Sequence, residues 1–214
     1  MRAAARVRPL HLLLAMSAVP VLAGLVRLGQ LALMQPLSEP RFSHAPMPVV
    51  LHVLSSMTYS VGGAFQVNSA ARTMMPARHR RLGWLVLGCG MLTAASGLWM
   101  TLQYTIPAPL QGDLLYGARL AVATAMVCAL ALALRAIWRR HVSAHRSWMV
   151  RAYALGQGAG TQVLLLLPVT VLAGEVTGLA RDMVMTGAWL GNLAVAEWML
   201  RRASITPATR ACRR

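Results

Sequence analysis

Long apolar runs separated by short polar segments dominate the chain. Each run is long enough for one helix across the hydrocarbon core of a bilayer, which takes roughly 20 residues. The runs cover about residues 10–34, 49–71, 83–105, 114–137, 148–172 and 183–203. Prolines lie in several of the gaps, where a helix ends because proline lacks a backbone donor. The pattern predicts an all-α, polytopic membrane bundle of about six transmembrane helices.

Composition supports a membrane location and a single bundle. The 214 residues are 57% hydrophobic and 12% charged, whereas soluble domains carry about 25% charged residues. We divide the chain into an N-terminal helix with its following loop (1–48), a five-helix core (49–203) and a basic tail (204–214). The first run also resembles a signal peptide, because Arg2, Arg6 and Arg8 precede it. Since its apolar character continues to Met34, we favour a retained helix.

The basic residues are distributed very unevenly between the two ends of the predicted helices. The net charge is +16, and all 21 basic residues are arginine. Seventeen of them fall on the side of the two chain termini, against Arg41 and Arg181 on the other side. The positive-inside rule then places both termini in the cytoplasm, which requires an even number of spans. The arginines flank apolar runs, so the expected partner is the lipid bilayer and not nucleic acid.

Polar residues recur along one face of the second run. His52, Tyr59 and Gln66 are seven residues apart and share a helix face. Such a stripe has to face protein or water, because unsatisfied polar groups in lipid cost several kcal/mol. It either packs helices together or lines a functional cavity, and the sequence leaves both open. Glycines at positions 83, 90 and 97 repeat at the same spacing in the third run and favour close helix packing.

Ionisable residues gather at the predicted cytoplasmic edge. A His-Arg pair begins each of two runs, and Arg151 and Glu197 lie at a similar depth. Because an intramembrane carboxylate is usually paired, Arg72, Arg80, Arg146 and Arg151 are the candidate partners of Glu197. Arg119 lies near the other edge, with Asp113 as its expected partner. We therefore predict a ligand or anion site formed by His79, Arg80, His145, Arg146, Arg151 and Glu197.

Four short motifs resemble a known bacterial family. They are His79-Arg80-x-x-Gly83, Ser96-Gly97-Leu98-Trp99, His145-Arg146-x-Trp148-Met149-x-Arg151-x-Tyr153-Ala154-Leu155 and Trp189-x-x-Asn192-Leu193-x-x-Ala196-Glu197-Trp198. This pattern, over about 49–203, is similar to the membrane proteins catalogued as domain of unknown function 2306. The chain departs from the family at Thr161-Gln162, where the family often has an arginine. The resemblance implies a multi-helix protein of a bacterial inner membrane and no established activity.

Three classes of function remain open. No nucleophile elbow, phosphate-binding glycine loop or metalloprotease motif occurs, so a structural or accessory membrane protein is the first expectation. A haem- or metal-binding redox protein is the second, with His79 and His145 as the candidate ligands. The third is a small transporter or a lipid- or quinone-binding protein, for which a homo-oligomer is a natural assembly. No cofactor is assigned.

Overall fold

The computed structural model describes residues 4–33, 42, 45–67 and 75–211. The predicted ends of the first two runs, at 34 and 71, lie outside the described residues, as does Arg72. No strand occurs in the described part of the chain. The helices are α1 (Ala4–Ala32), α3 (Pro46–Val67), α5 (Pro76–Gln103), α6 (Asp113–Trp138), α7 (Val142–Gly156), α8 (Gly158–Ala173) and α9 (Gly178–Ala211).

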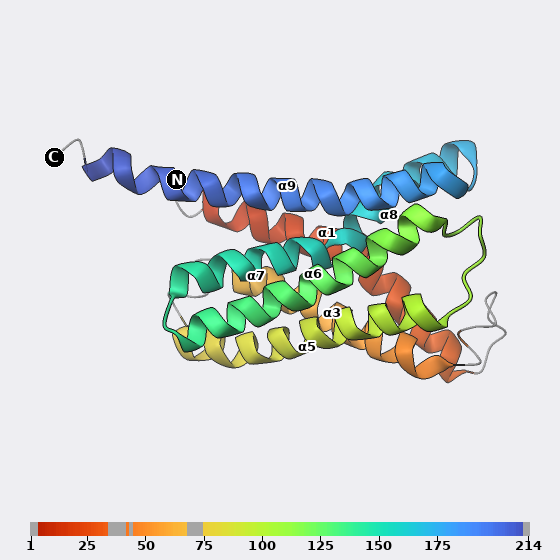
Figure 1. Ribbon diagram of the computed structural model, residues 1–214, viewed down its shortest axis with the longest axis horizontal. Coiled ribbons are helices and arrows are strands. Elements are labelled where there is room, and N and C mark those ends of the chain that lie inside the picture. The colour runs from red at the N-terminus through yellow and green to blue at the C-terminus, as the bar shows by residue number, and fades with distance from the viewer. Residues whose placement is uncertain (1–3, 34–41, 43–44, 68–74, 212–214) are drawn as a thin grey trace.

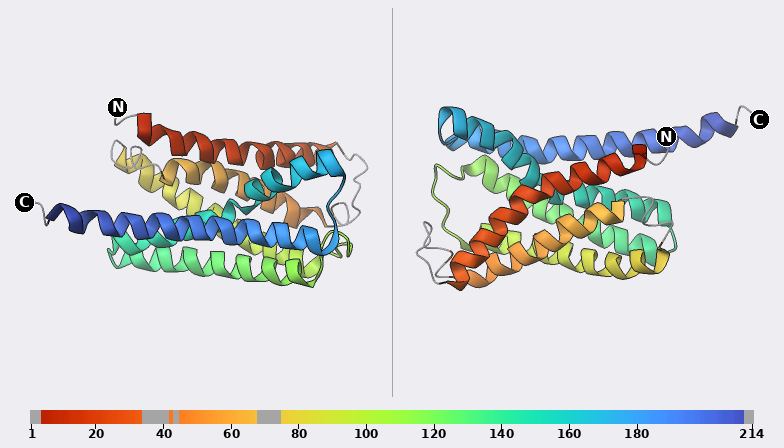
Figure 2. Two further views of the ribbon diagram at one scale, coloured as in Figure 1. Left: turned by 90° about the horizontal axis from the view of Figure 1, so that it is seen from above. Right: turned by 180° about the vertical axis from the view of Figure 1, so that it is seen from behind.

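The helices lie lengthwise in one elongated bundle (Figure 1). Helices α3, α5, α6 and α7 form its centre, α9 lies along α6, α7 and α8, and α1 crosses α3 and α8 (Figure 2). Helices α1, α5 and α7 begin at one end of the bundle, where α9 also finishes. We call this the terminal end. Helices α3, α6 and α9 begin at the opposite, distal end.

Four stretches of the described helices are long and apolar enough to cross a membrane. They are Leu10–Ala32, Pro76–Gln103, Asp113–Trp138 and Val142–Ala173. These stretches correspond to the first, third, fourth and fifth predicted runs, and they confirm a helical membrane architecture. Helices α3 and α9 match the second and sixth runs and have 22 and 34 residues. They are not among the four stretches.

The fifth run is not the single helix that we expected. It divides into α7 and α8 at Gln157. Glycines on both sides of Gln157 weaken the helix there. Aromatic rings occupy the space that their missing side chains leave, since a Cβ on Gly156 would lie 2.5 Å from Tyr59 Cε1 and a Cβ on Gly158 would meet the Trp189 ring. Tertiary packing therefore compensates for the interrupted helix.

Side chains of α9 form hydrogen bonds with backbone groups at the ends of other helices, where intrahelical partners are lacking. Asn192 Nδ2 donates to the Ala154 carbonyl oxygen at 3.2 Å, in the last turn of α7, where carbonyls lack an intrahelical donor. Asp182, 2% exposed, accepts hydrogen bonds from the backbone N–H groups of Gly112 and Leu115. It thus caps the first turn of α6, where a carboxylate also complements the positive end of the helix dipole.

A tyrosine of α3 and a tyrosine of α7 each pack against glycines of neighbouring helices. Tyr59, 1% exposed, lies against Gly90 of α5 and Gly156 of α7. Tyr153 covers Gly63 of α3, and its hydroxyl donates to the Ser60 carbonyl oxygen at 2.8 Å. The two rings lie 5.9 Å apart between centroids, a separation at which aromatic pairs attract. This arrangement fixes the spacing of α3, α5 and α7.

Two glycines of α5 provide a matched test of this packing. A Cβ on Gly90 would lie 2.6 Å from Tyr59 Cε2 and 3.0 Å from Leu130 Cδ1, whereas a Cβ on Gly88 would meet nothing within 4 Å. We expect Gly90→Ala to destabilise the protein by about 1–3 kcal/mol through overpacking. Gly88→Ala should be neutral or stabilising by up to about 1 kcal/mol through helix propensity. Unfolding in one detergent measures both, and equal effects would contradict the packing.

Candidate functional site

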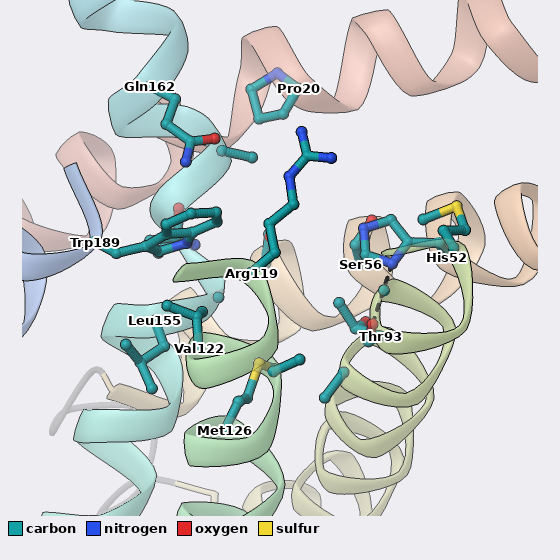
Figure 3. A pocket seen from close by; sticks show the side chains of 18 of the residues that line it. Pro20, His52, Ser56, Thr93, Arg119, Val122, Met126, Leu155, Gln162 and Trp189 are labelled. Atoms are coloured by element: carbon teal, nitrogen blue, oxygen red, sulfur yellow. Dashed lines mark hydrogen bonds between the residues drawn. The ribbon is translucent and has the colours of Figure 1, made fainter. Parts of the chain in front are cut away.

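A cavity of about 360 Å³ lies among the helices (Figure 3). All seven of the helices described above contribute to its wall. Arg119 and His52 each lie six residues from the start of their helix, α6 or α3, at the distal end. At 1.5 Å per residue, both are about 9 Å from that end. The volume is within the usual range of small-molecule sites, roughly 300–1,000 Å³, so the cavity is the leading candidate site.

Arg119 provides a positive charge in the cavity wall. Its side chain extends between Gln162 and Trp189 on one side and the His52 region on the other (Figure 3). Its Nη1 donates to Gln111 Oε1 at 2.5 Å, where the sequence led us to expect Asp113. No acidic side chain occurs among the described residues that line the cavity.

Hydrogen bonds to α5 hold His52 on the opposite wall. His52 Nδ1 lies 3.1 Å from the Thr93 carbonyl oxygen and 3.2 Å from Ser96 Oγ. Because a carbonyl oxygen only accepts, Nδ1 is the donor in this contact. Thr93 Oγ1 in turn donates to Ser55 Oγ at 3.0 Å. The imidazole is thus oriented before any ligand binds.

The interrupted helix contributes the third wall of the cavity. Residues on both sides of the break line it: Leu155, Gly156, Gln157, Ala159, Gly160 and Gln162. Gln157 precedes α8 and forms no side-chain cap there. Its Nε2 donates instead to the Tyr153 hydroxyl at 2.7 Å. The first turn of α8, with the positive end of its dipole, therefore lies at the cavity wall.

The polar stripe of α3 faces neighbouring helices along its whole length. A Cβ on Gly97 would lie 3.3 Å from His52, and one on Gly83 would lie 3.9 Å from Gln66, while Tyr59 packs on Gly90 as described. Gln66 Nε2 also donates to the His79 carbonyl oxygen at 2.9 Å. Of the three stripe residues, His52 lines the cavity. Tyr59 and Gln66 lie in helix contacts closer to the terminal end.

Of the six residues predicted to form the inner site, the structure brings Arg151 and Glu197 into direct contact. Arg151 and Glu197 form a two-point ion pair, with Arg151 Nη2 donating to Glu197 Oε2 at 3.0 Å. His145 Nδ1 lies 2.9 Å from the Ala133 carbonyl oxygen of α6. His79 contacts α3 through its carbonyl group, and Arg80 and Arg146 are exposed. In the described part of the chain, no three His, Cys, Asp or Glu side chains lie close enough to hold a metal ion.

Arg119 and His52 could be singled out from the sequence, and the cavity between them could not. Arg119 and His52 attracted attention as polar groups inside apolar runs. Thr93 did not, because single uncharged polar residues are common in membrane helices. The glycines around Gln157 were the available signal for the helix break. The spacing Gly156-x-x-x-Gly160 is typical of helix packing and does not by itself predict a break.

Comparison with known families agrees with the motifs. The model of the family described as predicted membrane protein, domain of unknown function 2306, matches residues 49–200. The chain belongs to this family. No curated protein and no solved structure is significantly similar to it. The matched segment contains α3 through most of α9, and therefore most of the cavity wall.

The Arg151–Glu197 pair is expected to hold α7 to α9. The two side chains are 28% and 33% exposed, so we expect a coupling of about 0.5–1 kcal/mol, the upper part of the range for exposed pairs, because the contact is two-pointed. A double-mutant cycle with Arg151→Gln and Glu197→Gln, followed by unfolding in detergent, measures it. Arg146→Gln is the matched control on α7. Additive effects of the two substitutions would contradict a stabilising pair.

Proposed function

We propose that this protein binds an amphipathic anion inside the membrane, in the cavity around Arg119. The observation that carries the proposal is that the guanidinium group of Arg119 and the first turn of α8 line one cavity. A guanidinium binds carboxylates and phosphates through charge-assisted hydrogen bonds. Apolar side chains such as Val122, Met126 and Leu155 supply a surface for a hydrocarbon group. This function belongs to the lipid-binding class.

The interrupted helix supports an anionic ligand independently of Arg119. In several membrane transport folds, a broken helix directs its half-helix N-terminus toward an anionic substrate. Here the first turn of α8 lines the same cavity as Arg119. The conformation of the break is held by Gln157 and Asn192 through bonds to Tyr153 and Ala154. The guanidinium group of Arg119 and the N-terminal end of α8 would then both attract the same anionic group of the ligand.

The proposal includes a topology of six spans with both termini in the cytoplasm. Helices α3 and α9 are long enough to cross the bilayer beside the four apolar helices. The cluster of arginines near the terminal end supports this orientation. The cavity would then lie in the outer half of the membrane, where its ligand enters from the outer leaflet or the periplasm.

Ligand binding is tested with dodecanoate on the purified, delipidated protein. We expect dodecanoate to raise the melting temperature in a saturable manner and dodecylammonium to have no such effect. Arg119→Gln should weaken dodecanoate binding by about tenfold or more, because a hydrogen bond to a charged group contributes roughly 1.5–3 kcal/mol. Equal binding of the two amphiphiles, or unchanged binding by the variant, would reject the proposal.

Two controls separate ligand binding from stability. Arg78→Gln removes an exposed arginine at the terminal end and should leave dodecanoate affinity unchanged. Gln66→Leu removes a stripe residue that does not line the cavity. It should cost about 0.6 kcal/mol of stability, the average of membrane hydrogen bonds, with binding retained. Loss of binding in Gln66→Leu would show that dodecanoate affinity follows general stability.

Topology is tested with reporters that are active in one compartment. A cytoplasmic reporter fused after Arg202 should be active, and a periplasmic reporter at the same position should be silent. A periplasmic reporter inserted at Leu110, in the connection between α5 and α6, should be active. The reverse pattern would invert the orientation. Periplasmic activity after Arg202 alone would contradict the even number of spans.

A further inference from the structure

A second, smaller pocket lies at the terminal end, on the corner between α6 and α7. It has a volume of about 160 Å³ and is lined by Leu132, Arg135, Ala136, Arg139, His141 and Trp148. It shares no lining residue with the Arg119 cavity. The volume suits a single small group rather than a whole lipid molecule. A ligand here would therefore occupy a site separate from that of the proposed intramembrane anion.

The walls of this corner pocket are basic. Arg135 in the last turn of α6, Arg139 directly after that helix and His141 line the pocket. No acidic side chain occurs among its described lining residues. The acidic side chain identified nearby, Glu197, is engaged by Arg151, whose guanidinium lies 4.7 Å from the centre of the Trp148 ring. Trp148 thus separates the basic pocket from the ion pair. The charge of the pocket favours an anion with several acceptor oxygens.

The chain folds sharply at this corner and leaves helix donors open. His141 donates its backbone N–H to the Ala136 carbonyl oxygen and Arg140 donates to Ile137, which closes α6. Arg140 takes a left-handed conformation with φ 60° to make this turn. His141 is then the N-cap of α7 but forms no side-chain cap. The 15-residue helix α7 therefore begins beside the pocket with the positive end of its dipole uncapped by a side chain.

Two exposed apolar residues are the sequence neighbours of the pocket residues Arg139 and His141. Trp138 and Val142 precede and follow the basic corner and are 70% and 62% exposed. Tryptophan is typical of the interface between hydrocarbon and headgroups. A free phosphate ion would gain nothing from these side chains, whereas the glycerol backbone and acyl chains of a phospholipid would cover them.

From these contacts we infer that the α6–α7 corner binds the phosphate group of an anionic membrane phospholipid. Arg135, Arg139 and the start of α7 hold the phosphate oxygens, and Trp138 and Trp148 contact the lipid below its headgroup. A basic pocket between membrane helices is a known form of lipid headgroup site. The bound lipid would tie the end of α6 to the start of α7.

The test measures binding of soluble dioctanoyl-phosphatidylglycerol to the delipidated full-length protein at physiological salt. Dioctanoyl-phosphatidylcholine and inorganic phosphate serve as comparison ligands. We expect the double variant Arg135→Gln/Arg139→Gln to bind phosphatidylglycerol about tenfold more weakly or worse. The matched control Arg140→Gln/Arg146→Gln removes the same charge from exposed arginines outside the pocket. Its affinity should change by less than about threefold, since neither side chain lines the pocket.

Four outcomes would overturn the inference. If both double variants lost the same affinity for phosphatidylglycerol, the lipid would be attracted by the total charge of the protein and not by the pocket. Equal binding of phosphatidylcholine would exclude recognition of an anion, and equal or stronger binding of inorganic phosphate would make the ligand a free ion. Unchanged affinity in Arg135→Gln/Arg139→Gln would remove the pocket from the site. Should that variant unfold, counting lipids retained on the single variant Arg139→Gln by native mass spectrometry gives the same comparison with Arg140→Gln.

Discussion

The contact between the polar face of α3 and the glycine face of α5 is the constraint on which the rest of the bundle depends. In lipid, helices gain little from burying apolar surface against one another, so close approach and hydrogen bonds have to hold them. The glycines provide the approach, because Gly83, Gly90 and Gly97 leave room for the three larger residues of α3. The polar atoms of α3 then reach the backbone of α5, as His52 and Gln66 do.

The inward face of α9 compensates for the cost of an interrupted α7–α8 segment. Residues spaced three or four apart on α9 form these contacts. They cap α6, accept a hydrogen bond from Gln162 and pack against Gly158. They also donate a hydrogen bond to the last turn of α7. Such a face is needed because irregular backbone at membrane depth persists only where protein satisfies its polar groups. The break then leaves space beside α8. Arg119, His52 and the first turn of α8 border this space, and it is the polar interior on which the proposed function rests.

Much of the fold could be predicted from the sequence, and less of the site. The heptad positions of His52, Tyr59 and Gln66 follow from helical periodicity, as do the matching glycines of the third run. Among the candidate arginine partners of Glu197, Arg151 forms the pair, which charge alone could not select because the four lie at similar predicted depths. The predicted joint site of His79 and His145 stays a prediction, since their observed contacts are with α3 and α6 separately.

The sequence by itself determined the helical class, the membrane location and the faces along which helices meet. Each of these depends on local properties, namely the length of apolar runs and the period of 3.6 residues per turn. Only the tertiary structure decided where α7 ends, which residues border the cavity and which arginines share the α6–α7 corner. These features arise where side chains from helices distant in sequence meet. Gln157 is the clearest case: its neighbouring glycines permit a break, but Tyr59, Trp189 and Asn192 stabilise it.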